Sequence, residues 1–170
     1  MNKITGHSEV HEDILEQFSD IISDLNRTCH ERFRRQCDIF CLNEAELRCL
    51  RLFDHNRYLT AKSIALRLGV TKGRVTRIIE GLVEKTLLHR RPDPDDARVT
   101  LLSLTPEGRE RREKVREHQL AVHRAVLERL SDHQRAEVLA MLTMLKGAMD
   151  AVDATMSLGE ALEQVQPPAC

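Results

Sequence analysis

The sequence has little of what marks many other protein classes: no tryptophan, one tyrosine, four phenylalanines, seven glycines and five prolines in 170 residues. No apolar run reaches the roughly 20 residues that a membrane-spanning helix needs. The first residues, MNKITGHSEVHEDILEQ, have neither the basic start nor the apolar stretch of a secretory signal. These absences predict a cytoplasmic protein that does not interact with membranes.

The sequence also lacks the short motifs of common active sites. It contains no glycine-rich phosphate loop, no HExxH metal motif, no GxSxG nucleophile motif and no CxxC pair. The five cysteines are an odd number at irregular spacing, which favours reduced thiols over a disulfide framework. We therefore expect a protein that is not an enzyme and that has no cofactor and no metal.

The charge is nearly balanced over the whole chain, at −1, but it is unevenly distributed. Between Thr60 and Arg98 there are nine Lys or Arg and five Asp or Glu, a local balance of +4 (9 − 5), so the remainder carries −5 (−1 − 4). A local concentration of positive charge is typical of a surface that binds nucleic acid. A dimer would present two such surfaces together.

The stretch from Leu59 to Thr86 has the pattern of two short helices joined by a tight turn. Ala65 is small where the second helix must cross closely, and Gly69 supplies a positive φ at no steric cost. Thr71 is placed to cap the second helix. Apolar residues then recur at helical spacing and would hold the second helix on a core: Val70, Val75, Ile78, Ile79 and Leu82.

The face of the second helix that is left over carries Lys72, Arg74, Thr76 and Arg77. This composition is expected of a helix in a DNA major groove, where Arg binds guanine edges and Thr contacts phosphates or thymine methyl groups. The alternative is that these side chains are ordinary solvated residues on a surface helix, without a role in binding. Phosphate contacts are expected from Lys62, Lys72, Arg90 and Arg91.

A β-hairpin with a long tip is predicted after the second helix. The segment from Leu87 to Arg91 is followed by two prolines, and an alternating apolar segment begins at Val99. At the tip, Asp96 is placed to orient the guanidinium of Arg98, which would then enter a minor groove. The predicted DNA-binding residues are Lys62, Thr71, Lys72, Arg74, Thr76, Arg77, Arg90, Asp96 and Arg98.

The run LGVTKGRVTRIIEGLVEKTLLHRRPDPDDARVTLLSLTPEG resembles the core of the MarR family of winged-helix transcription regulators. Two pieces carry the resemblance: Asp96-Ala97-Arg98 before an alternating strand, and the exit Leu104-Thr105-Pro106-Glu107-Gly108. The sequence departs from the family at Thr86, where the family usually has glycine, which predicts a strained or differently built left-handed turn. Gly81, inside the second helix, should weaken that helix by about 1 kcal/mol relative to alanine.

The predicted fold is mainly α with a small β-hairpin wing: a winged helix-turn-helix flanked by N- and C-terminal dimerisation helices. A first amphipathic helix is expected from Val10 to about Arg35, with an apolar connector over residues 37–41. Asn43, Thr105 and Ser131 are placed to cap later helices. The predicted domains are 1–41 (N-terminal dimerisation helix and connector), 42–105 (winged helix-turn-helix), 106–156 (C-terminal dimerisation helices) and 157–170 (flexible tail).

The terminal helices carry apolar stripes without a large core to cover, which predicts a twofold homodimer. The resemblance implies the same homodimer, a repressor of a pseudopalindromic operator in double-stranded DNA, released by a small-molecule and often anionic aromatic effector. Nothing in the sequence identifies the effector or its site. Two alternatives remain: a redox or metal sensor using Cys29, Cys37 or Cys41, and a winged helix that binds another protein.

Overall fold

The computed structural model of the chain describes residues 10–54, 56–96 and 98–155. It is mainly helical, with one small antiparallel sheet, which confirms the predicted fold class. The chain forms two compact units, one reaching to His118 and the other beginning at Gln119. The elements in chain order are α1 (Glu12–Phe40), α2 (Glu44–Arg51), the 3-10 helix η1 (Leu52–Asp54), β1 (Leu59–Thr60), α3 (Ala61–Leu68), α4 (Lys72–Glu84), β2 (Leu88–Pro92), β3 (Thr100–Leu104), α5 (Pro106–Leu127) and α6 (Asp132–Thr155).

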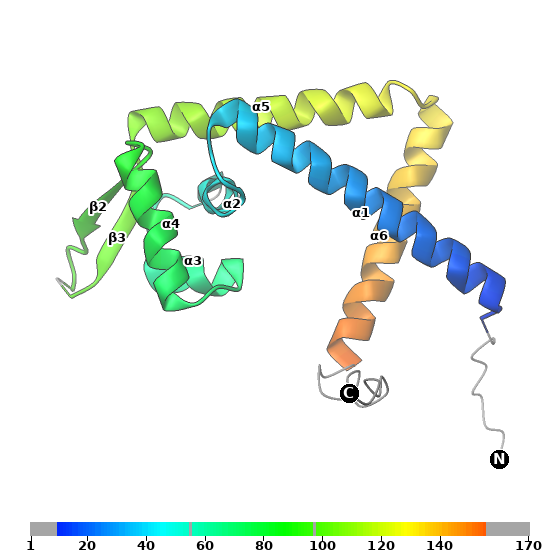
Figure 1. The fold of residues 1–170 in the computed structure, drawn as a ribbon, viewed down its shortest axis with the longest axis horizontal. Helices are drawn as coiled ribbons and strands as arrows, with labels where there is room; N and C mark the ends of the chain where they lie inside the picture. Colours follow the sequence, from blue (N-terminus) through cyan, green and yellow to red (C-terminus); the bar gives the residue numbers. More distant parts are fainter. Residues whose placement is uncertain (1–9, 55, 97, 156–170) are drawn as a thin grey trace, which may run out of the picture. The chain divides into compact units, whose positions relative to one another are not determined.

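The first unit contains the winged helix (Figure 1). Helices α3 and α4 form the predicted helix-turn-helix, with Gly69 at φ 63° in the turn between them. Strands β2 and β3 form the predicted hairpin, and a short strand that the sequence did not reveal, β1, pairs with β3. The largest fully buried side chains of the core come from α2, α3, α4, the turn before β2, the strands and the first part of α5: Leu47, Leu50, Ile64, Leu82, Leu87, Leu88, Leu102, Val75, Val115 and Cys49.

Helix α1 is longer than predicted. The residues expected to form a connector, 37–41, continue the helix to Phe40, and the helix ends where Cys41 adopts a left-handed conformation at φ 53°. The reason is packing, since Gln36 and Cys37 are buried and therefore keep the helical register at the end of α1. The predicted connector was therefore wrong in its position: only residues 41–43 separate α1 from α2.

The predicted helix caps are confirmed. Asn43 and Glu46 form a reciprocal capping box at α2, with bonds of 2.9 and 2.8 Å. The Thr71 hydroxyl accepts a bond from the Arg74 amide at α4, and the Thr105 hydroxyl accepts one from the Gly108 amide at α5. The Ser131 box at α6 pairs the Ser131 and Gln134 side chains with each other's backbone amides. Local sequence therefore determines where these helices begin.

The two departures from the family pattern have structural explanations. Thr86 stands in the left-handed region at φ 57°, as the turn there requires, and its hydroxyl donates to Glu107 Oε2 at 2.7 Å. Gly81 lies directly against a buried carboxylate, because a Cβ at this position would be 2.5 Å from Glu46 Oε1. Glu46 is 3% exposed and accepts bonds from the Asn43 amide and from Lys85 Nζ. Gly81 thus makes room for a carboxylate that joins α2 to α4.

The second unit contains the end of α5 and helix α6. From Asp132 to Asp153, the part of α6 whose side chains are described, no residue is buried. Leu139, Met141 and Leu142 are between 52 and 60% exposed. The predicted flexible tail, 157–170, lies outside the described residues. Within the part of the chain that the structure covers, no helix combines the length and the hydropathy needed to cross a membrane.

Candidate nucleic-acid interface

Helix α4 is divided into a buried face and an exposed face. Val75, Ile78, Ile79 and Leu82 are between 0 and 5% exposed, which fixes the rotation of the helix on the core. The predicted reading residues therefore face solvent, because they occupy the other positions of the same helix. Lys72, Arg74, Thr76 and Arg77 are all exposed, as is Thr71 at the cap.

Two of these side chains also have roles inside the helix. The Thr71 hydroxyl accepts the Arg74 amide at 3.4 Å, which satisfies one of the orphan donors at the helix N-terminus. The Thr76 hydroxyl donates to the Lys72 carbonyl at 3.0 Å. The Thr76 methyl group and the remaining acceptor lone pairs of its hydroxyl are what this residue can offer to a base or a phosphate.

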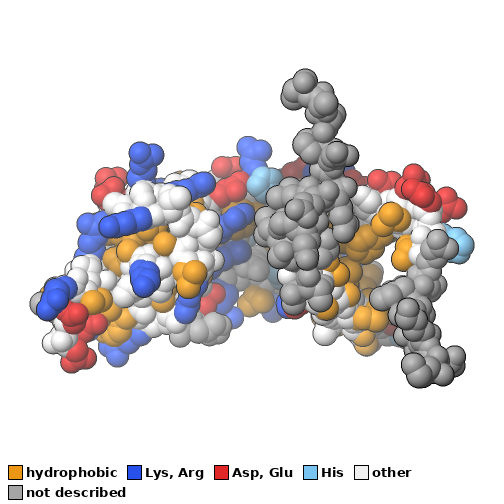
Figure 2. Space-filling model, turned by 90° about the horizontal axis from the view of Figure 1, so that it is seen from below, with side chains coloured by type: hydrophobic (Ala, Val, Ile, Leu, Met, Phe, Trp, Pro, Cys, Tyr) orange, Lys and Arg blue, Asp and Glu red, His pale blue; other side chains and the backbone are white. Residues whose placement is uncertain are grey.

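The cations of this face lack acidic partners. Among the described residues, no carboxylate lies within 4 Å of the charged groups of Lys62, Lys72, Arg74, Arg77 or Arg90. By contrast, Arg27, Lys114 and Lys146, on other helices, each contact a carboxylate at 2.7 Å or less. Figure 2 shows Lys and Arg side chains distributed over the winged-helix surface. An unpaired cation keeps its full capacity to bind a phosphate.

The strand register separates the two wing arginines that the sequence placed together. Arg90 pairs with Leu102 and therefore lies on the same face of the sheet as the buried Leu88 and Leu102, the face that packs on the core. Arg91 lies on the opposite face, where its guanidinium is 4.2 Å from the centre of the Tyr58 ring. Of the two arginines, only Arg90 lies on the sheet face that packs on the same core as α4.

At the wing tip, Asp96 acts mainly on the backbone. Its Oδ1 accepts the Arg98 amide at 3.0 Å, whereas the distance from Oδ1 to Arg98 Nε is 3.9 Å. Asp96 was expected to orient the guanidinium of Arg98. The two side chains form only a loose ion pair, and the side chain of Arg98 is 96% exposed. Asp93 fixes the preceding turn in the same way, through the Asp95 amide at 2.9 Å. The carboxylates shape the loop that presents Arg98.

The cysteines fall into two groups. Cys37 and Cys49 are buried, and burial raises the pKa of both thiols, that of Cys49 to about 12. Raised pKa values keep these two cysteines as thiols at neutral pH, which disfavours metal binding and oxidation. Cys29 and Cys41 are exposed in the single chain. No cluster of three His, Cys, Asp or Glu side chains suited to a metal ion occurs among residues 10–54, 56–96 and 98–155.

The sequence analysis did not predict the residues that hold α4 on its buried side. Glu46 reaches from the start of α2 to Lys85 Nζ at 2.6 Å, just after the end of α4. A glycine inside a strongly amphipathic helix is the one signal that could have indicated this contact, because such a residue often marks a close approach. Its partner could not be identified from spacing, since Glu46 and Lys85 are 39 positions apart.

Comparison with known proteins gives relatives of one kind. Residues 42–100 match the model of the MarR family. The HTH-type transcriptional repressor YetL of Bacillus subtilis (strain 168) is 29% identical over 150 residues, covering 82% of this chain and 86% of YetL.

Solved structures resemble the fold over most of the chain. A MarR family protein from Bacillus stearothermophilus aligns with a TM-score of 0.75 at 17% identity, over 84% of this chain and 99% of that one. A MepR variant of S. aureus bound to an oligodeoxyribonucleotide aligns with a TM-score of 0.59 at 18% identity, over 78% of this chain and 97% of that one. Residues 42–100 of this chain are therefore a MarR family winged-helix domain, and the solved structures share the fold over most of the chain.

Proposed function

We propose that the protein acts as a homodimer, binds a pseudopalindromic operator in double-stranded DNA, and represses transcription until a small-molecule effector releases it. The observation that carries the proposal is the exposed face of α4, where three cations without acidic partners among the described residues, Lys72, Arg74 and Arg77, stand opposite a fully packed face. Such a helix is held rigidly and presents its donors without first breaking other ion pairs.

The arrangement suits insertion of α4 into a major groove. Arg74 and Arg77 would donate bidentately to guanine edges, and Thr76 would contact a base or phosphate. Arg98, at the wing tip, would enter the adjacent minor groove, where a narrow groove attracts a guanidinium. Asp96 would contribute by shaping the loop. Phosphate contacts would come from Lys62, Thr71, Lys72 and Arg90.

The dimer is proposed from the apolar faces of α1 and α6. Phe18, Ile21 and Leu25 of α1 are 46 to 60% exposed, and Leu139, Met141 and Leu142 of α6 are equally open. Exposed large apolar side chains in such numbers favour association with a partner surface. Two copies joined there would present two α4 helices to half-sites about 10 base pairs apart, which is one turn of duplex.

Repression and DNA binding are supported by the relatives. YetL is named as a repressor, and the MepR structure contains an oligodeoxyribonucleotide. A bound effector would weaken DNA binding only if it binds the DNA-competent and DNA-incompetent states with different affinity. The expected effector is a small, anionic aromatic molecule, as in the family resemblance.

The test is selection of binding sites from random duplexes, followed by titration of the selected duplex at several salt concentrations. We expect two half-sites and a steep fall of affinity with added salt, because released counterions dominate the binding free energy. Arg98→Ala should reduce the salt slope by about 1, because it removes one cation that neutralises a phosphate charge. Arg74→Ala should cost about 1–3 kcal/mol and relax the preference at one base pair.

Arg35→Ala is the matched control. Arg35 is an exposed arginine of α1, so the variant removes the same charge from the same chain outside the proposed interface. Its salt slope should equal that of the wild type. A protein that selects no duplex, or binds with no salt dependence, would favour the protein-binding alternative and defeat the proposal.

A further inference from the structure

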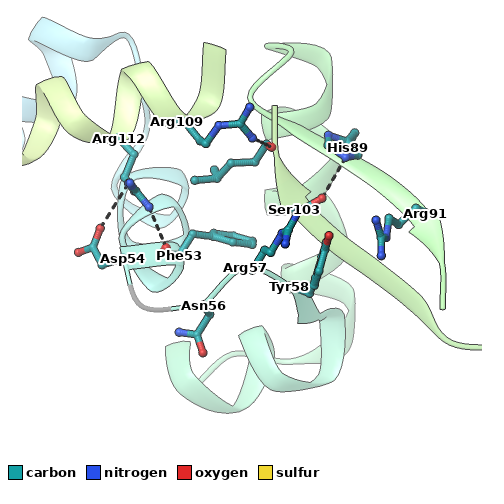
Figure 3. Close-up of a pocket in the computed structure, with 11 residues that line it drawn as sticks. Phe53, Asp54, Asn56, Arg57, Tyr58, His89, Arg91, Ser103, Arg109 and Arg112 are labelled. Carbon is teal, nitrogen blue, oxygen red and sulfur yellow. Dashed lines mark hydrogen bonds and ion pairs between the residues drawn. The ribbon is translucent and has the colours of Figure 1, made fainter. Parts of the chain in front are cut away.

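A pocket of about 660 Å³ lies in the first unit, on the side of the wing sheet away from the core (Figure 3). Three segments form it: residues 53–54 and 56–58, the facing strands β2 and β3, and the first turns of α5. Its cationic side chains are Arg57, Arg91, Arg109 and Arg112. They come from positions up to 55 apart (112 − 57), so only the folded chain gathers them.

The strand register places this pocket on a different surface from the proposed DNA-binding face. His89 pairs with Ser103 across the sheet, and Arg91 pairs with Leu101, so these side chains project opposite to Leu88 and Leu102, which pack on the core. His89 Nε2 and Ser103 Oγ are 2.9 Å apart, and both residues line the pocket. The residues that line the pocket are therefore not placed to contact the bases that α4 would bind.

The pocket has an excess of positive charge. Four guanidinium groups line it against one carboxylate, that of Asp54, which gives a balance of +3 (4 − 1) with His89 neutral. Asp54 Oδ1 lies 3.8 Å from Arg112 Nε, and Arg112 Nη1 donates to the Phe53 carbonyl at 2.9 Å. Arg112 is thus partly neutralised and held in place. The excess charge comes from the other three arginines.

Those three arginines have no acidic partner in the part of the chain that the structure describes. Arg57 and Arg91 lie over the Tyr58 ring, with guanidinium carbons 5.4 and 4.2 Å from its centre. Arg109 donates one bond, from Nη1 to the Leu104 carbonyl at 2.9 Å. Each guanidinium has five N–H donors, so most of the donors remain available. The contacts with Tyr58 and Leu104 fix the directions in which these donors point.

We propose that this pocket binds a small organic anion that carries two carboxylate or phosphate groups. One anionic group would bind Arg57 and Arg91 beside Tyr58, and the other would bind Arg109, with Arg112 behind it. Planar guanidinium forks match carboxylate and phosphate geometry bidentately. Tyr58 offers apolar surface to the carbon skeleton between the two charges.

The bound anion would also affect the wing, and this effect rests on the proposed function. Arg91 belongs to β2, the strand that leads into the tip carrying Arg98. An anion that draws Arg57 and Arg91 together would stabilise one arrangement of the hairpin base. By linkage, the anion and the operator would then change each other's affinity by the same factor.

The DNA backbone is a second source of the same anionic chemistry, so the test must separate it from a free anion. The probes are isophthalate, a rigid aromatic dicarboxylate, and citrate, with the neutral isophthalamide as the shape-matched control. Titration calorimetry and NMR of the arginine Nε–H signals of the full chain, without DNA, measure binding. We expect saturable binding of at least one of the two anionic probes and none of isophthalamide.

Arg91→Gln and Arg109→Gln should each weaken that probe by at least about tenfold, since each removes a charge-assisted donor pair. Arg77→Gln, which removes an arginine from α4, should leave the probe affinity unchanged. Equal affinities in the Arg91, Arg109 and Arg77 variants, or shifts that never saturate, would overturn the proposal.

Duplex titration in probe-free buffer completes the design. If Arg91→Gln weakens the duplex as strongly as it weakens the probe, the pocket binds DNA phosphate and the small-anion assignment fails. If the wild type binds the probe but no duplex, the anion site stands and the operator proposal falls. The two proposals therefore fail by different results.

Discussion

The centre of this chain and its ends use apolar residues in opposite ways. Between Cys37 and Val115 most apolar side chains pack into one core, although Ile39 and Leu66 are exposed. Leu47, Leu50, Ile64 and Leu82 have no exposed surface. In α1 up to Leu25 and in α6, most apolar side chains recur at helical spacing but stay exposed, as Phe18 at 46% and Met141 at 60% do. Figure 2 shows such hydrophobic side chains at the surface.

The difference teaches that an amphipathic pattern predicts a buried face without telling what buries it. In α4 the apolar positions meet α2 and the strands of the same unit, so the pattern is satisfied within the chain. In α6, between Asp132 and Asp153, no apolar side chain is buried by the rest of the described chain. Burying apolar surface is worth roughly 25 cal/mol per Å², which is a strong drive to associate.

The largest expected effect comes from placing a charge on the open face of α6. Leu142→Glu, at a residue 52% exposed in the single chain, should convert the proposed dimer to monomers, because the carboxylate would be buried unpaired at the interface. Affinity for a two-half-site duplex should then fall on the order of 100-fold, since the second half-site would no longer be bound in the same complex. Sedimentation analysis and duplex titration measure the two effects.

Ala140→Glu is the control, because it introduces the same charge two positions away, on the opposite side of α6. It should leave the protein dimeric. Both variants should keep the thermal transition of the winged helix, whose core contains no α6 residue among those described. If Leu142→Glu sediments like the wild type, α6 does not form the interface and the contrast between the two regions has another cause.

Local rules account for what the sequence predicted well. Thr71, Asn43, Thr105 and Ser131 were identified as caps because capping depends on three or four neighbouring residues. The rotation of α4 followed from the spacing of its apolar residues, which also determined that Arg74 and its neighbours face solvent. The wing followed from two apolar segments separated by prolines.

Contacts between distant segments were not predictable in this way. The anion pocket depends on the register of β2 against β3, which sends Arg90 and Arg91 to opposite faces, and on Tyr58 lying under one of them. The end of α1 depends on the burial of Cys37. None of these contacts leaves a periodic mark on the sequence, because each joins residues from different elements.

The second prediction compares the two sides of α4, which has one glycine, Gly81, on its buried side and another, Gly73, on its exposed side. Gly81→Ala should destabilise the protein by up to about 2 kcal/mol. Its Cβ would meet the buried Glu46 carboxylate at 2.5 Å and force that group from its bonds, a loss of about 1–3 kcal/mol that the helix-propensity gain of about 1 kcal/mol offsets in part. Gly73→Ala, where a Cβ meets nothing within 4 Å, should stabilise by up to about 1 kcal/mol through helix propensity. Urea unfolding midpoints at constant m measure both.

Combining Gly81→Ala with Glu46→Ala isolates the cause. The double variant should lose less stability than the sum of the two single variants, because the clash disappears with the carboxylate. Strict additivity would mean that Gly81 is required for a reason other than the space beside Glu46.

The smallest expected effect is at Thr86, which lies between α4 and the wing. Its backbone has a strained left-handed conformation within the packed part of the chain. Thr86→Gly should stabilise by up to about 1 kcal/mol, because glycine adopts φ 57° without the Cβ penalty, while the loss of the bond to Glu107 offsets part of the gain. Thr86→Ala loses the same bond but keeps a Cβ, so the difference between the two variants in urea unfolding measures the backbone strain less the extra conformational entropy that glycine loses on folding. That difference should be about 1 kcal/mol in favour of glycine. Equal stability of the Thr86→Gly and Thr86→Ala variants would mean that the turn relaxes to accommodate a Cβ, so that the left-handed backbone at this position carries no strain beyond that entropy difference.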